Sequence, residues 1–249
     1  MCTMTRVHYP EIGSFPGYTT EQIGWDATVE LADELIRITG AAYAAEVANP
    51  RNNSIDKKGN PLLVESVQRH YDTGDTGVYE RFLDRTEGIH EAGGRITVLR
   101  DPAAPGKLLG YSKIGPAPAM TQRENGLEGS HDFFGLYINN VVVDPNHFGK
   151  GIGGILLDSC LKTANAEVGD VLVLDAMHGN NRANEWYTRL GFRARPEVPT
   201  GSLSFGNQAV PQVYMYAPNA GPVMANLAGA RLGYISSDRH TAIEKSFIA

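Results

Sequence analysis

The sequence has few cysteines and no long apolar run. Its 249 residues include only Cys2 and Cys160, so it offers neither a disulfide framework nor a zinc-binding spacing, and no metal site is predicted. No run approaches the roughly 18 apolar residues of a membrane-spanning helix. The start, MCTMTRVHYP, lacks the basic and then apolar segments of a secretory signal. We therefore expect a reduced, cytoplasmic protein without a membrane partner.

Positive charge is not in excess either. The chain carries 22 Lys and Arg against 28 Asp and Glu, a formal net charge of −6. Nucleic-acid-binding proteins usually present a basic surface, so we expect no nucleic-acid partner. The 42% of hydrophobic residues is enough to build one large domain.

The first half of the chain is mainly helical in pattern. Residues 1–25 are rich in Gly, Pro, Thr and Tyr and predict an extended arm. From Asp26, apolar residues at helical spacing predict an amphipathic helix that fades at Asn49-Pro50. A second helical region follows the polar turn at residues 51–61, is interrupted at residues 72–77, and ends at Gly93-Gly94.

Strands then alternate with helices. The expected strands are Arg95–Asp101 and Lys107–Gly115, which form a hairpin, then Phe133–Val143, Val171–Ala176, Phe192–Arg195 and Gln212–Ala217. The expected helices are Ile152–Ala166 and Asn180–Leu190, the second closed by Gly191.

This order predicts an α/β fold with a single mixed, mostly antiparallel twisted sheet of about six to seven strands flanked by helices. The strands on either side of the Ile152 helix should be parallel, with a right-handed crossover. We expect the domain to span residues 26–217. Residues 218–249 form a tail that docks on the domain or serves as an oligomer arm, as in a homodimer.

A glycine-rich loop, VVVDPNHFGKGIGG, joins one strand to the next helix. Gly149, Gly151, Gly153 and Gly154 remove Cβ atoms there and allow successive N–H groups to point inward. The following helix adds the positive end of its dipole. The loop therefore predicts an anion site suited to a pyrophosphate, with a purely structural tight turn as the alternative.

The spacing Gly149-x-Gly151-x-x-Gly154 also matches a dinucleotide-binding fingerprint, and Asp175 ends the next strand where a ribose-binding acid would lie. Two features disfavour this interpretation. Residues 144–148 separate the strand from the glycines, and the unit lies past the middle of the chain rather than at its start.

A different family accounts for both features. The sequence resembles the GNAT (GCN5-related) N-acetyltransferases, whose first motif is a V-x-P strand end followed by Q/R-x-x-G-x-G/A and whose second is N-x-x-A-x-x-x-Y followed by G-F. The matching residues are Val143-Asp144-Pro145, then Phe148-Gly149-Lys150-Gly151-Ile152-Gly153, and, further on, Asn180 to Phe192. The resemblance implies the acyl-CoA N-acyltransferase fold, acetyl-CoA as cosubstrate, and transfer to an amine.

The resemblance also assigns site residues. Main-chain amides of the glycine loop would grip the pyrophosphate of coenzyme A, and the preceding strand would offer main-chain groups to the pantetheine arm and to the thioester carbonyl. The implied cofactor-binding residues are Val141, Val142, Val143, Phe148, Gly149, Lys150, Gly151, Ile152, Gly153, Gly154, Asn180 and Ala183.

Tyr187 is the predicted general acid. Asn180, Ala183 and Tyr187 are spaced i, i+3, i+7, so a helix places them on one face. Tyr187 would then reach the thioester sulfur. With reference pKa values of about 10 for a phenol and 8.5 for a thiol, proton transfer is modestly uphill, and a strengthening hydrogen bond is sufficient. The alternative is that Tyr187 is a core residue.

The general base is not evident. Where the family often has a strand Glu, this chain has Asn139-Asn140, and Asn is depleted in strands. Strict alternation puts Asn139 on the face of Val141 and Val143, where it would orient substrate or water, whereas a bulge is the alternative. Other candidate proton acceptors are His131, Asp132, Asp175 and His178, or a water molecule.

Phe148 is a second departure, because the family usually has Gln or Arg there. Main-chain amides and Lys150 are expected to compensate.

The acceptor site should be walled by the first two helices, the 51–61 turn, the loop at residues 116–130 and the segment at residues 196–211. Their acids include Asp56, Glu124, Glu128 and Glu197, which either suit a cationic amine or form a solvated surface.

Three functions remain open from the sequence. The first is an acetyl-CoA-dependent N-acetyltransferase acting on a small-molecule or peptide amine. The second is a degenerate relative that binds coenzyme A without catalysis. The third is an NAD(P) oxidoreductase of the Rossmann type.

Overall fold

A computed structural model of the protein describes residues 18–72, 76–116, 135–167, 170–196 and 201–229. In chain order the elements are β1 (Thr19–Ile23), α1 (Trp25–Glu30), α2 (Ala32–Ala48), α3 (Val64–His70), α4 (Thr76–Glu91), β2 (Arg95–Asp101), β3 (Ala104–Pro116), β4 (Gly135–Val143), the 3-10 helix η1 (Pro145–His147), α6 (Ile152–Thr163), β5 (Val171–Met177), α7 (Asn181–Leu190), β6 (Arg193–Ala194), β7 (Ser202–Phe205) and β8 (Gln208–Ala217). A further helix covers residues 220–229.

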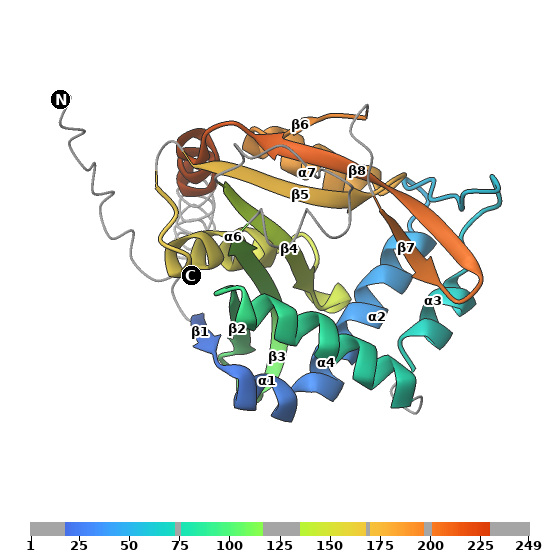
Figure 1. The fold of residues 1–249 in the computed structure, drawn as a ribbon, viewed down its shortest axis with the longest axis horizontal. Coiled ribbons are helices and arrows are strands. Elements are labelled where there is room, and N and C mark those ends of the chain that lie inside the picture. The colour runs from blue at the N-terminus through green and yellow to red at the C-terminus, as the bar shows by residue number, and fades with distance from the viewer. Residues whose placement is uncertain (1–17, 73–75, 117–134, 168–169, 197–200, 230–249) are drawn as a thin grey trace, which may run out of the picture.

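The strands form one mixed sheet of the predicted kind (Figure 1). Its order is β1-β2-β3-β4-β5-β8-β6, with β7 paired to β8, so the described sheet has 8 strands rather than six to seven. Every pairing is antiparallel except that of β4 with β5, which is parallel as predicted. The fold class is therefore confirmed.

Helices cover both faces of the sheet. In β2, Ile96 and Val98 pack in a core shared with α2, whereas Leu99 faces the other way, into a core shared with α6. This alternation is the expected consequence of the strand period of two. A larger core on the α6 side joins α6 and α7 to strands β3, β4, β5 and β8.

The N-terminal end differs from the prediction, whereas the first part of the C-terminal tail follows one of its two alternatives. Residues 19–23, assigned from the sequence to an extended arm, form the edge strand β1 and pair with β2. In the expected tail, Ala220, Val223 and Leu227 are buried in the α6-side core, so this part of the tail docks on the domain. The rest of the tail lies outside the described residues.

β4 leaves its parallel partner early. In the parallel register, Gly135 pairs with Val171 and Tyr137 pairs with Val173. Within the described residues, β4 and β5 do not pair beyond Tyr137 and Val173. On its other edge, β4 stays paired with β3 as far as Val143. A gap therefore opens between the two central strands of the sheet.

A bulge lies where the gap begins. The β3 register skips Asn139, since Lys113 pairs with Asn140 and Ile114 with Ile138. Ile138 packs in the α6-side core, and Val141 packs against the same core, although an odd number of positions separates them. The prediction that Asn139 shares a face with Val141 by strict alternation is therefore wrong, because the bulge inserts an extra residue.

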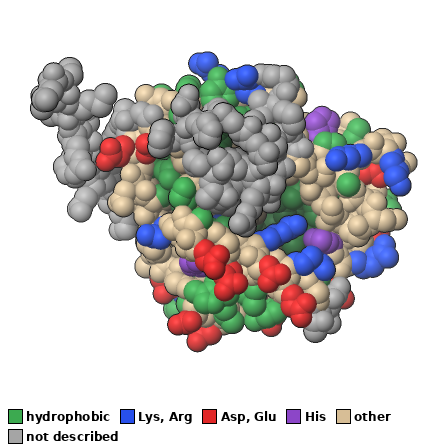
Figure 2. All heavy atoms as spheres, in the orientation of Figure 1, with side chains coloured by type: hydrophobic (Ala, Val, Ile, Leu, Met, Phe, Trp, Pro, Cys, Tyr) green, Lys and Arg blue, Asp and Glu red, His purple; other side chains and the backbone are tan. Residues whose placement is uncertain are grey.

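α4 covers the α2 side of β3 and is strongly amphipathic. Phe82 and Thr86 turn toward the sheet, and acidic side chains gather over α1 and α4 at the lower edge of the view in Figure 2. The inner face contains Lys113, which is 4% exposed and donates from Nζ to Thr86 Oγ1 at 2.8 Å. Its Nζ also lies 4.3 Å from the centroid of the Phe82 ring. Burial, with a smaller contribution from the Arg85 guanidinium, lowers the Lys113 pKa from 10.5 to about 7.

Lys113→Met is expected to reduce the rise of stability with pH. Between the folded pKa of about 7 and the ordinary value of 10.5, the unfolded chain binds more protons at this site than the folded chain. The free energy of unfolding of the wild type therefore rises through this window by up to about 1.4 kcal/mol per pH unit from this group. Urea unfolding across the window measures the slope, with the exposed Lys58→Met as control. Equal slopes in wild type and Lys113→Met would contradict this assignment.

Candidate active site

A pocket of about 440 Å³ lies at the gap between β4 and β5. Its lining comes from α2, β4, the glycine loop, α6, β5 and α7. Every residue predicted from the sequence to bind cofactor or to act in catalysis lines this pocket, apart from Lys150, which is exposed and is not part of the lining. The pocket thus joins two motifs that are distant in the sequence.

The glycine loop presents unbonded amides to the pocket. Gly149 and Gly151 have φ values of 78° and 77°, the left-handed region that favours glycine, and a Cβ atom on either would meet nothing within 4 Å. Within the described residues, no acceptor is recorded for the N–H groups of Gly149, Gly151, Ile152 or Gly153. Gly151 is the N-cap of α6, so the helix dipole adds positive potential. The loop is therefore built to bind an anion.

The approach to this loop is fixed by Asp144. Its Oδ1 accepts from the Asn146 N–H at 2.9 Å, and its own N–H donates to the Leu109 carbonyl at 2.8 Å. Pro145 begins η1, where the missing N–H costs nothing. The residues between the strand and the glycines therefore form a short helix, and this helix sets the orientation of the loop.

α7 supplies the opposite wall. Asn180 is its N-cap, and the side-chain Oδ1 accepts from the Ala183 N–H at 3.2 Å, so the helix begins one residue later than predicted. Asn180, Ala183 and Tyr187 all line the pocket, as the i, i+3, i+7 spacing predicts. Gly191 ends the helix with φ at 109°.

Tyr187 lies between the core and the pocket. It belongs to the α6-side core and is 9% exposed, and its ring packs edge-on against Phe192 at 5.6 Å between centroids. Burial raises its pKa well above the ordinary phenol value, and Tyr43, another pocket residue from α2, raises it further. The hydroxyl therefore stays protonated at neutral pH. Tyr187 is therefore a core residue that also lines the pocket.

The connection between α2 and α3 contacts two pocket-lining residues, Glu46 and Asn180, through the side chain of Asn52. The Asn53 N–H donates to the Gly179 carbonyl at 2.9 Å, and the Lys57 N–H donates to the Ala209 carbonyl at 2.8 Å. Gly179 has a φ of 80°, and a Cβ there would lie 2.2 Å from the Asn53 oxygen. This connection is therefore attached through main-chain atoms to both the β5–α7 turn and the β7–β8 hairpin.

A model of the acetyltransferase (GNAT) family matches residues 63–192, which is more than half of the chain. The chain belongs to this family. Its members use acetyl-CoA as cosubstrate, and the open amides at the start of α6 fit the pyrophosphate of that molecule. The GNAT sheet is mostly antiparallel, which disagrees with the parallel sheet of the dinucleotide-binding interpretation.

Several solved structures are similar to this chain at low sequence identity. A Corynebacterium glutamicum structure, described as histone acetyltransferase HPA2 and related acetyltransferase, is 20% identical, with 82% of this chain and 97% of that chain covered and a TM-score of 0.50. A GCN5-related N-acetyltransferase from Rhodopseudomonas palustris is 16% identical, with 80% and 94% covered and a TM-score of 0.49. The PaiA N-acetyltransferase from Thermoplasma acidophilum, solved in complex with coenzyme A, is 12% identical, with 81% and 98% covered and a TM-score of 0.48.

Among curated proteins, no significant sequence match was found. In the part of the chain that the structure describes, no helix combines the length and apolar character needed to cross a bilayer.

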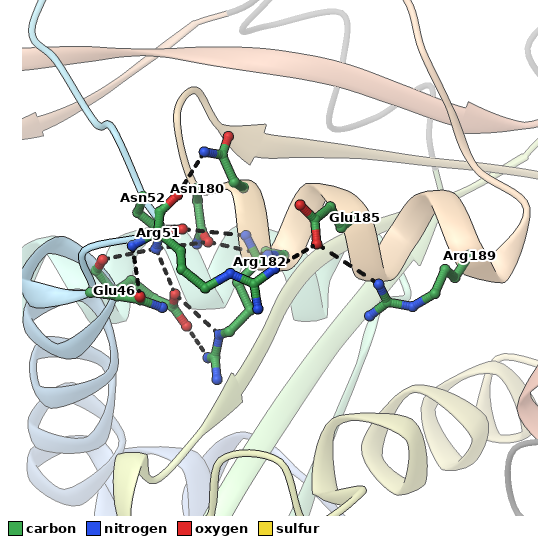
Figure 3. A network of polar contacts seen from close by, with 10 residues as sticks. Glu46, Arg51, Asn52, Asn180, Arg182, Glu185 and Arg189 are labelled. Atoms are coloured by element: carbon green, nitrogen blue, oxygen red, sulfur yellow. Dashed lines mark hydrogen bonds and ion pairs between the residues drawn. The ribbon is translucent and has the colours of Figure 1, made fainter.

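In this GNAT chain an arginine lies over Phe148. The Arg182 guanidinium carbon is 3.8 Å from the centroid of the Phe148 ring, and Arg182 also forms an ion pair with Glu46 of α2 (Figure 3). Asn52 Nδ2 donates to Glu46 Oε2 at 2.9 Å and to Asn180 Oδ1 at 3.3 Å. A cation from α7 therefore occupies the neighbourhood where the family usually has Gln or Arg, whereas Lys150 does not.

Only some of these residues were predictable from the sequence. Arg182 lies inside the second motif, but its contact with Phe148 depends on how α7 docks. Tyr43, Glu46 and Trp186 also line the pocket. Tyr43 and Glu46 are one helical turn apart on α2, and no motif marks them.

The candidate proton acceptors differ in whether they line the pocket. Asp175 lines the pocket, whereas His178 is exposed and does not. His131, Asp132, Glu124, Glu128 and Glu197 lie outside the described residues. Asp56 is buried in the 51–61 turn, where its Oδ1 accepts from the N–H groups of Lys58 and Asn60 at 2.8 and 2.9 Å, so it stabilises the turn rather than lining the site.

Arg182→Leu is expected to destabilise the GNAT domain by about 2 kcal/mol, because Glu46 keeps a charge without its cation. The estimate is moderate because the Arg182 side chain is 36% exposed. Adding Glu46→Gln should recover at least about 1 kcal/mol. Urea unfolding of both single variants and the double variant measures this coupling. Additive losses would show that the ion pair contributes nothing.

Proposed function

We propose that the protein is an acetyl-CoA-dependent N-acetyltransferase that transfers an acetyl group to a primary amine of a small molecule or peptide by direct attack on the thioester. The observation that carries this proposal is the set of open amides at the start of α6, next to the gap between β4 and β5. We assign the catalytic domain to residues 26–217, with β1 as an added edge strand.

The binding roles follow from the pocket. The open amides of Gly149, Gly151, Ile152 and Gly153 hold the pyrophosphate. Main-chain groups of Val141, Val142 and Val143 bind the pantetheine arm along the free edge of β4. Asn180 and Ala183 form the facing wall. A main-chain N–H of the same β4 segment holds the thioester carbonyl oxygen as negative charge develops on it.

Acetyl-CoA supplies an acyl group activated as a thioester. The role of Tyr187 is to hold a proton where the sulfur leaves, and its raised pKa keeps the phenol in the donor form. Its hydrogen bond strengthens as negative charge builds on the sulfur. Asn139 at the bulge orients the amine or a water, since an amide side chain cannot take the proton.

One observation favours a second candidate, a coenzyme A-binding module without catalysis. The bulge of β4 carries Asn139 and Asn140 where a carboxylate would serve as base, and Phe148 replaces a polar motif residue. Both candidates share the cofactor site, so only a turnover measurement separates them.

Calorimetric titration and an amine panel test the proposal. Coenzyme A should bind with an affinity in the micromolar range, and acetyl-CoA should release free thiol only when a suitable amine is present. Binding without amine-dependent thiol release would establish the non-catalytic candidate. Absence of binding would refute both.

Tyr187→Phe should lower kcat by about 100-fold, because one proton donor is lost, and leave coenzyme A affinity within about threefold. Steady-state kinetics and calorimetry measure the two effects. Tyr79→Phe is the matched control, since its hydroxyl contacts the Val29 carbonyl on α1, outside the pocket. Unchanged turnover in Tyr187→Phe would remove Tyr187 from the mechanism.

A further inference from the structure

Two arginines and a tryptophan share one face of α7. Arg182, Trp186 and Arg189 are spaced i, i+4, i+7, and this spacing puts side chains on one side of a helix. All three line the pocket, and Tyr187 lines it from the adjoining face of the same helix. The α7 face therefore offers two cations and one large aromatic ring to a ligand.

Trp186 packs against the first turn of α6. A Cβ atom added to Gly153 would lie 3.6 Å from Trp186 Cη2 and 3.7 Å from Cζ2, so the indole lies close to the α6 backbone at this point. In the part of the chain that the structure describes, the Gly153 N–H has no acceptor. The indole also contacts the Tyr187 ring, with 4.8 Å between the ring centroids. An anion at the open amides of the glycine loop therefore binds next to Trp186.

The charged side chains of the pocket are separated by element. Among the described residues, the carboxylates that line it are Glu46 of α2 and Asp175 of β5, whereas both arginines belong to α7. The start of α6 adds the positive end of its helix dipole beside α7. An anionic end of a ligand is therefore favoured between α6 and α7.

The two arginines differ in how far their charge is already paired. Arg182 donates from both Nε and Nη2 to the carboxylate of Glu46. Arg189 Nη1 lies 3.9 Å from Glu185 Oε2, outside hydrogen-bond distance, and Arg51 lies closer to the same oxygen, at 3.3 Å. The Arg189 side chain is also 67% exposed, so its pair with Glu185 contributes little. Arg189 is therefore the arginine of the pocket whose charge can be given to a ligand.

A docked helix fixes the end of α7 that carries Arg189. Asn226, in the helix at residues 220–229, donates from Nδ2 to the Leu190 carbonyl at 3.1 Å. Leu227 of the same helix lies 3.8 Å from a Cβ atom added to Gly154 in the first turn of α6. This helix therefore contacts both the last turn of α7 and the first turn of α6, and it holds the two turns in a fixed relation.

The chemistry of coenzyme A decides which part of the molecule reaches this face. Its diphosphate joins the pantetheine arm to an adenosine 3′-phosphate. The proposed function places the diphosphate on the open amides of the glycine loop and the pantetheine arm along β4. The adenosine end must then lie on the side of the diphosphate that is away from the β4–β5 gap, toward solvent. The exposed Arg189 lines the pocket there.

We propose that Arg189 binds the 3′-phosphate of coenzyme A, that Trp186 contacts the adenosine, and that the two residues select coenzyme A thioesters over donors that end at phosphopantetheine. This inference rests on the proposed function and specifies its donor class. A guanidinium forms charge-assisted hydrogen bonds with a phosphate, and an aromatic side chain gains free energy by stacking on a base. A donor without the nucleotide makes neither contact.

The first test is Arg189→Gln with coenzyme A and 3′-dephospho-coenzyme A as ligands in calorimetry. The affinity for coenzyme A should fall roughly tenfold, as for one lost charged hydrogen bond. The affinity for 3′-dephospho-coenzyme A should stay within about twofold, because that ligand lacks the group that Arg189 binds. Arg51→Gln is the matched control, since Arg51 pairs with the same Glu185 but does not line the pocket.

Equal losses for the two ligands in Arg189→Gln, or no loss for either, would overturn the role of Arg189. Arg189→Lys should recover part of the affinity for coenzyme A, because it keeps the charge and loses the planar fork. A rise of KM for an anionic amine such as glutamate, with unchanged affinity for coenzyme A, would place Arg189 at the acceptor instead.

Tryptophan fluorescence tests the contact of Trp186. The other tryptophan, Trp25, packs edge-on against His90 and lies outside the pocket, so Trp25→Phe leaves Trp186 as the single reporter. Coenzyme A should quench this emission, and 4′-phosphopantetheine should leave it nearly unchanged. The same change with both ligands would show that Trp186 does not contact the adenosine.

Trp186→Leu should weaken coenzyme A about tenfold and 4′-phosphopantetheine by less than about twofold, since base stacking is lost only for the first. Trp186→Phe should retain part of the affinity. The fluorescence experiment decides the assignment if Trp186→Leu does not fold, because that experiment keeps the indole in place.

Donor selection is measured by kcat/KM for acetyl-coenzyme A and for S-acetyl-4′-phosphopantetheine. The wild type should prefer acetyl-coenzyme A by at least about tenfold, and the preference should shrink in Arg189→Gln. Equal affinity of the wild type for coenzyme A and 4′-phosphopantetheine would overturn this inference and leave the proposed function intact. Absence of amine-dependent thiol release would refute the proposed function, whereas the calorimetric comparison does not require turnover.

Discussion

Parallel pairing between β4 and β5 is confined to the stretch that ends at Tyr137 and Val173, and the rest of the site depends on this early separation. A continuous ladder would fill the edge of β4 with hydrogen bonds to β5 and close the pocket. Separation instead leaves one edge of Val141 to Val143 accessible while β3 holds the other. The strand is therefore held rigidly by β3, while the N–H and C=O groups of its other edge can bind an extended ligand.

Contacts from several different elements hold the polar groups of the pocket in position. Asp144 fixes the turn before α6, Asn180 caps α7, and the Glu46–Arg182 ion pair joins α2 to α7 (Figure 3). Because these contacts come from different elements, the shape of the pocket does not depend on any single one of them. Preorganisation of this kind reduces the free energy that ligand binding must spend on ordering side chains.

Local patterns were sufficient for much of the fold and for the cofactor end of the site. The bounds of β2 and β5 agree with the sequence to within one residue, because short apolar runs between glycines and polar turns specify strands strongly. The glycine loop and the spacing of Asn180 and Tyr187 are also local features, so a single sequence reveals them.

Other features arise from packing between distant segments. β1 has the polar sequence TTEQI and is a strand only because β2 offers it an edge. The bulge at Asn139 follows from the register with β3 and reverses the face that alternation predicts. The contact of Arg182 with Phe148 likewise requires the docked position of α7. Propensity and periodicity carry no information about such pairings.

The main-chain attachment of the α2–α3 connection has a consequence for how the sequence of this segment can diverge. Asn53 and Lys57 bond through their backbone N–H groups to Gly179 and Ala209, and these bonds are indifferent to the side chains that residues 53 and 57 carry. Descendants of this sequence can therefore exchange those side chains and still keep the connection in place. Position 179 has no such freedom, because a Cβ atom there would collide with the main chain of Asn53.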